Sequence, residues 1–179
     1  LEASFGFPHL SKDDIRYSKK LAGGALNDAG AYTICAILDL LGPDSELMFS
    51  DLNTEDGYDV DTSGMAIFMR DNVKAVCKWA MGGSYKNELI IWCEKGHIVV
   101  DRVFSKPENY IAKIKVLHNG IVTEDLTSGV DNHFTNMFGF FVDQVLLTSY
   151  SEKSLNLFLQ SKIMQEIRFN DNEVKAYET

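Results

Sequence analysis

Hydrophobic positions recur along the chain with two different periods, and each change of period marks a new element. Between Leu26 and Leu41 apolar residues recur every three or four positions, after Gly23-Gly24 and before Gly42-Pro43. This spacing predicts an amphipathic helix with glycines at its start and a Gly-Pro pair at its end. The opening residues, LEASFGF, have the composition of a strand.

From residue 46 to residue 126 the period is two, which is typical of strands. Asp71-Asn72 and Asn119-Gly120 are two-residue hairpin signals, and Glu94-Lys95-Gly96 is a short glycine-bearing loop. Strands joined this tightly run antiparallel. The predicted strands are Glu46–Leu52, Gly64–Arg70, Val73–Met81, Glu88–Cys93, His97–Phe104, Tyr110–His118 and Ile121–Leu126.

The helical period returns after Asn132, with Asp131 or Asn132 available as N-cap, and a second helix follows from about Ser154. The first of these helices has a broad apolar stripe made of Phe134, Met137, Phe138, Phe141, Val142, Val145 and Leu146. Together the elements predict a single α+β domain over residues 1–179, with a large, mostly antiparallel (mixed) open sheet and helices packed on one face.

Composition and charge are those of a globular domain and exclude several partners. Of the 179 residues 45% are hydrophobic and 24% are charged, and the net charge is −9. An acidic chain repels phosphate backbones and anionic membranes, so we expect neither nucleic acid nor a membrane as partner. The separated cysteines Cys35, Cys77 and Cys93 lie between apolar residues. We expect buried reduced thiols and a cytoplasmic protein.

Motifs for metal, nucleotide and nucleophile sites are missing. The loop from Asp51 to Asp61 alternates oxygen-bearing side chains, but Asp56 and Thr62 stand where a calcium loop needs glycine and glutamate. The histidines lack zinc spacing, so we expect no metal. The patterns GxGxxG, GxxxxGK[ST] and GxSxG do not occur, so we expect no cofactor bound to this chain by itself.

The remaining candidate site is the start of the first helix. Asp28 and Tyr32 are four residues apart, so they share one helix face near the positive end of the dipole. Gly30 between them is expected to leave that face open to a ligand. The alternative is structural, with Asp28 accepting hydrogen bonds from first-turn amides and Tyr32 in the core. Spacing by itself favours this alternative, because carboxylates are common at helix starts.

The residues around this helix resemble a known family. The segments in question are Asp14-Ile-Arg16-Tyr, Gly23-Gly24-Ala-Leu-Asn-Asp28-Ala-Gly30-Ala-Tyr32 and Leu41-Gly42. They are similar to the opening of the C-terminal domain of the Gfo/Idh/MocA family, the relatives of glucose-fructose oxidoreductase and inositol dehydrogenase. The family pattern is G-G-[GA]-x-L-x-D-x-G-x-[HY], and here one spacer residue is missing after Gly24.

The resemblance implies a dihydrodipicolinate-reductase-like domain that shapes a sugar pocket and forms a homodimer through its sheet. It implies that Tyr32 transfers a proton, that Asp28 holds the substrate hydroxyl and that Arg16 lies near the pocket. NAD or NADP would be bound by an N-terminal Rossmann domain that is absent from this chain, which begins as if cut from a longer protein. A free tyrosine has a pKa of about 10 and needs a nearby cation, which the family supplies as a lysine of that domain. Lys106-Pro107, which follows a predicted sheet strand, does not supply it.

Two hypotheses for function result. The first is the substrate-binding and dimerisation domain of an NAD(P)-dependent oxidoreductase for a sugar or sugar derivative, inactive without its Rossmann domain. The second is a non-catalytic binding or homodimerisation module of the same fold, with Val73–Met81 and Leu89–Cys93 covered and no ligand near Asp28. The identity of the sugar, the choice between NAD and NADP and the reaction direction stay open at this point.

Overall fold

A computed structural model describes residues 1–147 and 152–177. The strands are β1 (Glu2–Phe7), β2 (Glu46–Asn53), β3 (Ser63–Arg70), β4 (Val73–Met81), β5 (Lys86–Cys93), β6 (Gly96–Asp101), β7 (Lys113–His118) and β8 (Ile121–Thr127). The helical elements are η1 (Ile15–Tyr17), η2 (Lys19–Leu21), η3 (Leu26–Gly30), α1 (Ala31–Leu41), α2 (His133–Leu147) and α3 (Glu152–Tyr177).

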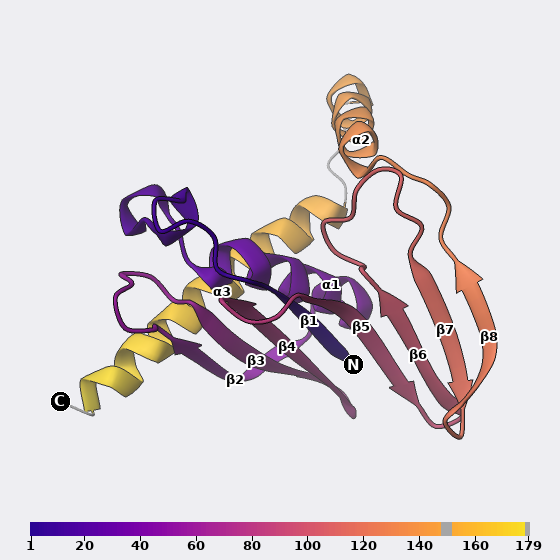
Figure 1. Cartoon of the computed structure of the whole chain (residues 1–179), viewed down its shortest axis with the longest axis horizontal. Helices are drawn as coiled ribbons and strands as arrows, with labels where there is room; N and C mark the ends of the chain where they lie inside the picture. Colours follow the sequence, from indigo (N-terminus) through magenta and orange to yellow (C-terminus); the bar gives the residue numbers. More distant parts are fainter. Residues whose placement is uncertain (148–151, 178–179) are drawn as a thin grey trace.

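All eight strands form one sheet in the order β2-β3-β4-β1-β5-β6-β7-β8 (Figure 1). β1 runs parallel to β4 and antiparallel to β5, and the other neighbouring strands are antiparallel. The mixed, mostly antiparallel sheet is therefore confirmed. What the hairpin signals did not predict is the insertion of β1 between β4 and β5, which divides the expected meander into two antiparallel groups.

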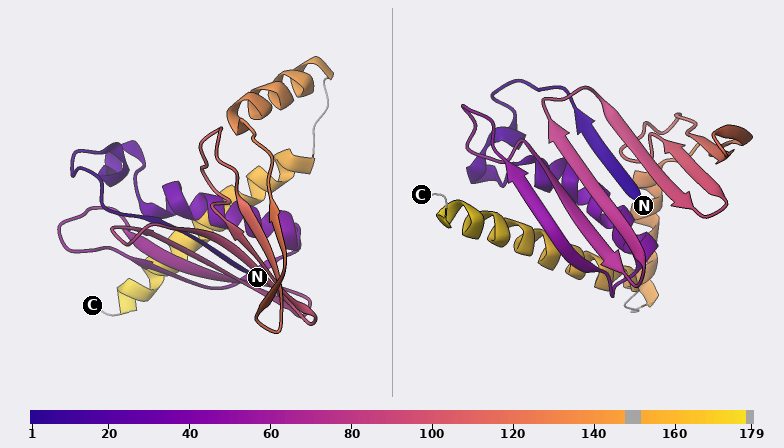
Figure 2. Two further views of the ribbon diagram at one scale, coloured as in Figure 1. Left: turned by 45° about the vertical axis from the view of Figure 1, so that its right-hand side comes forward. Right: turned by 90° about the horizontal axis from the view of Figure 1, so that it is seen from below.

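Helices α1 and α3 pack on one face of the sheet, and the described part of the chain places no helix on the opposite face (Figure 2). Alternate residues of β4 show this sidedness, because Ala75, Cys77 and Trp79 are buried whereas Lys74 and Lys78 are exposed. Hydrophobic side chains on a half-covered sheet alternate in this way. The core lies between this face of the sheet and the two helices and includes Ile34, Ile37, Leu38, Phe68 and Ile167.

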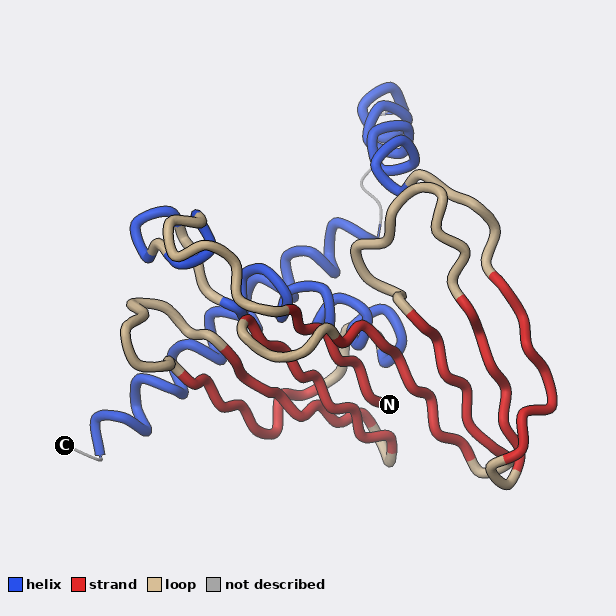
Figure 3. The backbone as a smooth tube through the Cα atoms, in the orientation of Figure 1, coloured by secondary structure: helices blue, strands red, loops and turns tan. Residues whose placement is uncertain are grey.

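Helix α2 stands at the end of the sheet, away from the strands (Figure 3). The side chain of Asn132 accepts a hydrogen bond from the Thr135 N–H at 3.0 Å, which confirms Asn132 as the N-cap. The predicted apolar stripe is present, but it is not part of the core. Each of its seven residues is more than half exposed. The stripe is therefore an apolar surface beside the end of β8.

Burial differs between the apolar helical segment near the N-terminus and the three cysteines. The segment Lys19–Leu41 is long and apolar enough to cross a membrane by length and composition, but half of its most apolar window is buried, as in a helix packed on a sheet. The cysteines are unpaired, and Cys77 is buried as expected whereas Cys93 is exposed. The expectation of burial is wrong for Cys93, because it lies in the last position of β5 beside the β5–β6 turn.

Candidate functional site

Residues from separate segments meet at one end of the sheet. β1, β6 and β8 run in the same direction, so their carboxyl ends lie together with the start of β5. A pocket of about 500 Å³ opens there, a volume typical of small-molecule sites. It is lined by Phe5, Phe7, Leu10, Asp14, Arg16, Asp28, Tyr32, Tyr85, Arg102 and Ser105. The three site residues predicted from the sequence, Arg16, Asp28 and Tyr32, are among them.

The Gly23-Gly24 pair holds the helix start against the loop that carries Arg16. A side chain at Gly23 would collide with the carbonyl oxygen of Arg16, and the Gly24 N–H donates to that oxygen at 2.8 Å. Gly24 has a φ of +115° and packs against the carboxylate of Asp61, where a side chain would collide. Only glycine combines this backbone angle with this close approach. The motif thus brings Arg16 and the helix start together.

Asp61 caps the helix in place of Asp28. Its carboxylate accepts a hydrogen bond from the Leu26 N–H at 2.6 Å, and its backbone carbonyl accepts one from the Ala25 N–H at 2.8 Å. Burial raises the pKa of the Asp61 carboxyl. The structural role that the sequence allowed for Asp28 therefore belongs to Asp61. Among the side chains that the structure describes, those of residues 1–146 and 156–171, no cluster of His, Cys, Asp and Glu is able to hold a metal ion.

The helix begins with a π-helical turn, η3, which the Ala31 N–H closes by donating to the Leu26 carbonyl. Such turns are rare and often lie at functional sites. Gly30 does not leave this face open to a ligand, so that expectation is wrong. A Cβ at Gly30 would lie 3.0 Å from Cδ2 of Trp79, on the sheet side. The glycine instead lets the helix approach the buried indole, while Asp28 and Tyr32 line the pocket.

Asp14, Arg16 and Asp28 form what we call the acidic end of the pocket. Arg16 Nε donates to Asp28 Oδ2 at 2.9 Å and Nη1 donates to Asp14 Oδ1 at 3.1 Å. The hydrogen bond with Asp28 raises the pKa of the Arg16 guanidinium, and the hydrogen bond with Asp14 raises it further. The Arg16 backbone N–H lowers the pKa of Asp14. One cation between two carboxylates leaves this end with a net negative charge.

Tyr32 lies beside the acidic end, in the first turn of α1. Its ring packs edge-on against Phe5, with centroids 5.5 Å apart at 85°, and lies 6.3 Å from the ring of Phe104. Its side chain is nevertheless 44% exposed. A carboxylate and a phenol in one pocket are suited to binding a hydroxyl and to moving a proton. The individual roles of Tyr32, Asp28 and Arg16 remain predictions.

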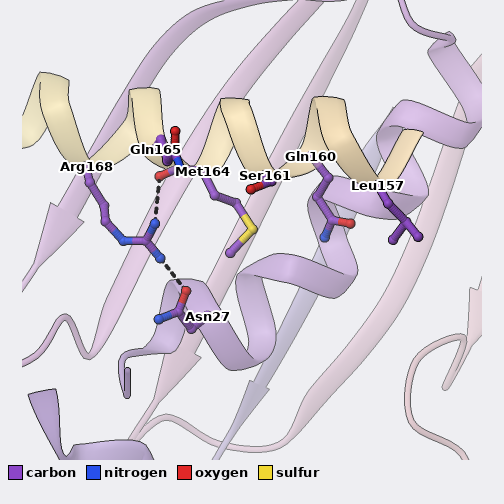
Figure 4. Close-up of a pocket in the computed structure, with 7 residues that line it drawn as sticks. All are labelled: Asn27, Leu157, Gln160, Ser161, Met164, Gln165 and Arg168. Carbon is purple, nitrogen blue, oxygen red and sulfur yellow. Dashed lines mark hydrogen bonds between the residues drawn. The ribbon is translucent and has the colours of Figure 1, made fainter. Parts of the chain in front are cut away.

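A second pocket, of about 300 Å³, lies between α3 and η3 on another side of the helix start (Figure 4). Arg168 donates to the side-chain oxygen of Asn27 and, at 3.3 Å, to the Met164 carbonyl. The amide nitrogen of Asn27 donates to the Ala22 carbonyl at 2.7 Å. These groups are bonded to one another, so the contact attaches α3 to the helix start and supports the first pocket from behind.

Sequence reasoning missed the part of the pocket formed by Tyr85, Arg102 and Ser105, which we call the basic end. The expected strand His97–Phe104 is wrong beyond Asp101, because Arg102 has a φ of +46° and leaves the strand conformation. No motif marks these positions. Tyr85 precedes β5 and the other two follow β6, so only the pairing of those strands brings them together.

Comparisons with known proteins agree with this architecture. A family model described as the GFO/IDH/MocA C-terminal domain matches residues 1–99. A dTDP-3,4-didehydro-2,6-dideoxy-alpha-D-glucose 3-reductase from Saccharopolyspora spinosa is 36% identical over 124 residues, which are 68% of this chain and 37% of the relative. An enzyme of the same description from Streptomyces antibioticus is 30% identical over 143 residues, 79% of this chain and 43% of the relative.

Among solved structures, the 3-ketoreductase KijD10 from Actinomadura kijaniata, in complex with NADP and TDP-benzene, superposes with a TM-score of 0.87 at 28% identity. The match covers 94% of this chain and 52% of that chain. The chain therefore spans about half the length of the proteins it resembles.

Proposed function

Because this chain belongs to the GFO/IDH/MocA family and matches its C-terminal domain, we propose that it is the substrate-binding domain of an NADP-dependent enzyme that reduces a ketone on a nucleotide-linked sugar. The relatives' names support the sugar and the reduction, and the KijD10 complex supports NADP. The observation that carries the proposal is the pocket in which Tyr32 lies beside the Asp28–Arg16 pair.

The residues of this chain do not fit a dinucleotide. Its one Gly-Gly pair before a helix is packed against Arg16 and Asp61, which leaves no room for a pyrophosphate to approach those backbone amides. We therefore propose that a Rossmann domain outside these 179 residues binds NADP and that the chain by itself is inactive. Detectable NADPH-dependent turnover by the 179-residue chain would contradict this.

In the proposed reaction NADP held by the other domain would supply a hydride to the ketone carbon, and this chain would supply the proton. Tyr32 donates its phenolic proton to the ketone oxygen, which becomes the alcohol, and is reprotonated from solvent. The Asp28 carboxylate, whose orientation Arg16 sets through the 2.9 Å hydrogen bond, accepts a hydrogen bond from a sugar hydroxyl. This contact positions the ketone beside Tyr32.

Two apolar surfaces suit the proposed partners. The helix-free face of the sheet carries Val76, Ile90, Val99 and Trp92, the last 83% exposed, around a shallow hollow. Apolar surface of this kind marks interaction sites, and we propose that a second copy of the chain covers it. The α2 stripe lies at the pocket end of the sheet, where the Rossmann domain must approach. Sedimentation as a monomer at micromolar concentration would contradict the dimer.

The test of the catalytic proposal is Tyr32→Phe in the two-domain protein, measured by steady-state oxidation of NADPH with a dTDP-linked keto sugar. Losing the proton donor is expected to lower kcat by about 10²–10⁴-fold with little change in KM. Tyr58→Phe is the matched control, because the Tyr58 hydroxyl contacts His9 outside the pocket. An unchanged kcat for Tyr32→Phe would remove Tyr32 from the mechanism.

A non-catalytic homodimerisation module is the second candidate, favoured by the apolar helix-free face. It predicts a dimer whose pocket binds no sugar nucleotide. Turnover by the two-domain protein that depends on Tyr32 would reject it.

A further inference from the structure

The basic end of the pocket carries a guanidinium that the described part of the chain leaves unneutralised. Arg102 Nε is buried and has no hydrogen-bond partner. Among residues 1–146 and 156–171, whose side chains the structure describes, no carboxylate forms an ion pair with Arg102, whereas Arg16 in the same pocket is paired with two. A cation without a partner at the wall of a pocket is available to an anionic ligand.

Two aromatic rings hold this guanidinium. Its Cζ lies 4.8 Å from the centroid of the Tyr110 ring and 5.5 Å from that of Tyr85. The Tyr110 hydroxyl donates to Asp101 Oδ2 at 2.7 Å, and this hydrogen bond raises the pKa of Tyr110. The same bond places more electron density on the ring and strengthens its attraction for the cation. Ring contacts satisfy the faces of a guanidinium and leave its N–H groups free to donate.

The loop that carries Arg102 is held in an uncommon conformation. Arg102 and Ser105 both have left-handed backbone angles, with φ of +46° and +43°. The buried side chain of Asn87 donates to the Phe104 carbonyl at 2.5 Å and accepts from the Phe104 N–H at 2.9 Å. The Arg102 N–H donates to the Asn87 carbonyl at 2.8 Å. Such positions persist where the surroundings enforce them, often at ligand sites.

We propose that Arg102 binds the phosphate groups of the substrate at the basic end of the pocket. Its planar fork of donors matches phosphate oxygens and forms two parallel charge-assisted hydrogen bonds with them. The net negative charge of the acidic end repels the same group, so the phosphates lie at Arg102 and the sugar extends toward Asp28 and Tyr32. The subsite itself is inferred from the position and contacts of Arg102. Only the identity of the ligand as a sugar nucleotide rests on the proposed function.

Isothermal titration of the 179-residue chain with TDP, thymidine, glucose 1-phosphate and NADP tests the subsite. Losing hydrogen bonds to a charged group predicts that Arg102→Ala weakens TDP binding about 10–100-fold and leaves thymidine binding unchanged. Arg102→Lys keeps the positive charge but loses the planar fork of donors, so its affinity for TDP should lie between those of the wild type and Arg102→Ala. Lys113→Ala removes an exposed positive charge outside the pocket lining and should bind TDP as the wild type does.

Equal affinity of the wild type and Arg102→Ala for TDP, or no TDP binding by the wild type, would overturn the proposal. Tighter binding of NADP than of TDP at Arg102 would assign the subsite to the cofactor, and binding of glucose 1-phosphate but not TDP would assign it to a simple sugar phosphate. Either of these two outcomes would reject a sugar nucleotide as the ligand of the subsite.

If thermal unfolding shows that Arg102→Ala does not fold, Arg102→Gln replaces it in the same titrations. Absence of ketone reduction by the two-domain protein, with Arg102-dependent TDP binding intact, would reject the proposed function and leave the subsite standing.

Discussion

The two ends of the pocket each contain an arginine, yet they differ in what that arginine is able to bind. At the acidic end Arg16 is bonded to Asp14 and Asp28, so its charge is already satisfied within the chain. At the basic end Arg102 lies between two aromatic rings with a buried, unpaired Nε. The partners of a charged side chain, more than its residue type, therefore determine its role in a site.

The ends also differ in how they are supported. The acidic end rests on a helix start held by Asp61, by the close packing of Gly30 on Trp79 and by the contact of Arg168 with Asn27. The basic end rests on a loop held by Asn87. Changes in these supports should therefore affect the two ends separately.

The largest effect is expected at the basic end, from Asn87→Ala. It leaves the buried N–H and carbonyl of Phe104 without their partner, and unpaired buried groups predict a loss of about 2–4 kcal/mol in the free energy of unfolding. TDP affinity should fall as well, because Arg102 is released. Urea unfolding and titration measure both, with exposed Asn72→Ala as control. A stability within about 0.5 kcal/mol of wild type would show that Asn87 does not support the loop.

An intermediate effect is expected at the acidic end, from Gly30→Ala. The added methyl meets the Trp79 ring at 3.0 Å and should cost about 1–3 kcal/mol of unfolding free energy by overpacking. In the two-domain protein kcat should fall while TDP affinity in the 179-residue chain is kept. Gly139→Ala in α2, where nothing lies within 4 Å, is the matched control and should be neutral or stabilising. An equal loss of kcat and of TDP affinity in Gly30→Ala would show that the two ends of the pocket are not supported separately.

The smallest effect is expected from Asp61→Asn and depends on pH. Because burial raises the pKa of Asp61 on folding, the native state holds its proton more tightly than the unfolded state. The contribution of Asp61 to stability is therefore complete below its ordinary pKa of 3.8 and is lost as pH rises through the raised value. Asparagine still accepts from Leu26 but does not ionise, so the variant lacks this decline.

Urea unfolding from about pH 4 to about pH 7 measures the difference between Asp61→Asn and wild type, which should grow in favour of the variant with rising pH. Asp51→Asn, an exposed carboxylate in β2, controls for the loss of one negative charge. Parallel profiles for Asp61→Asn and wild type would contradict the assignment of the buried charge.

The acidic end could be predicted and the basic end could not. Arg16, Asp28 and Tyr32 lie within one short segment around a helix start, where spacing and family resemblance act together. Tyr85 and Arg102 are brought together by the pairing of β5 with β6, and nothing near either residue in the sequence signals the other. Gly30 illustrates the same limit, because its position in the helix was evident but the side on which it is needed was not.

What the sequence determined by itself was local: the periods that separate helix from strand, the turn residues Asp71 and Asn119 that adopt positive φ, and a helix cap at Asp131 or Asn132. These depend on backbone preferences and on hydrogen bonds a few residues apart. Tertiary structure decided the insertion of β1 between β4 and β5, the exposure of the α2 stripe and which of the two arginines lining the pocket lacks a carboxylate partner among the described side chains. Strand pairing, burial and charge neutralisation sum contributions from distant segments, so they exist only once the chain has folded.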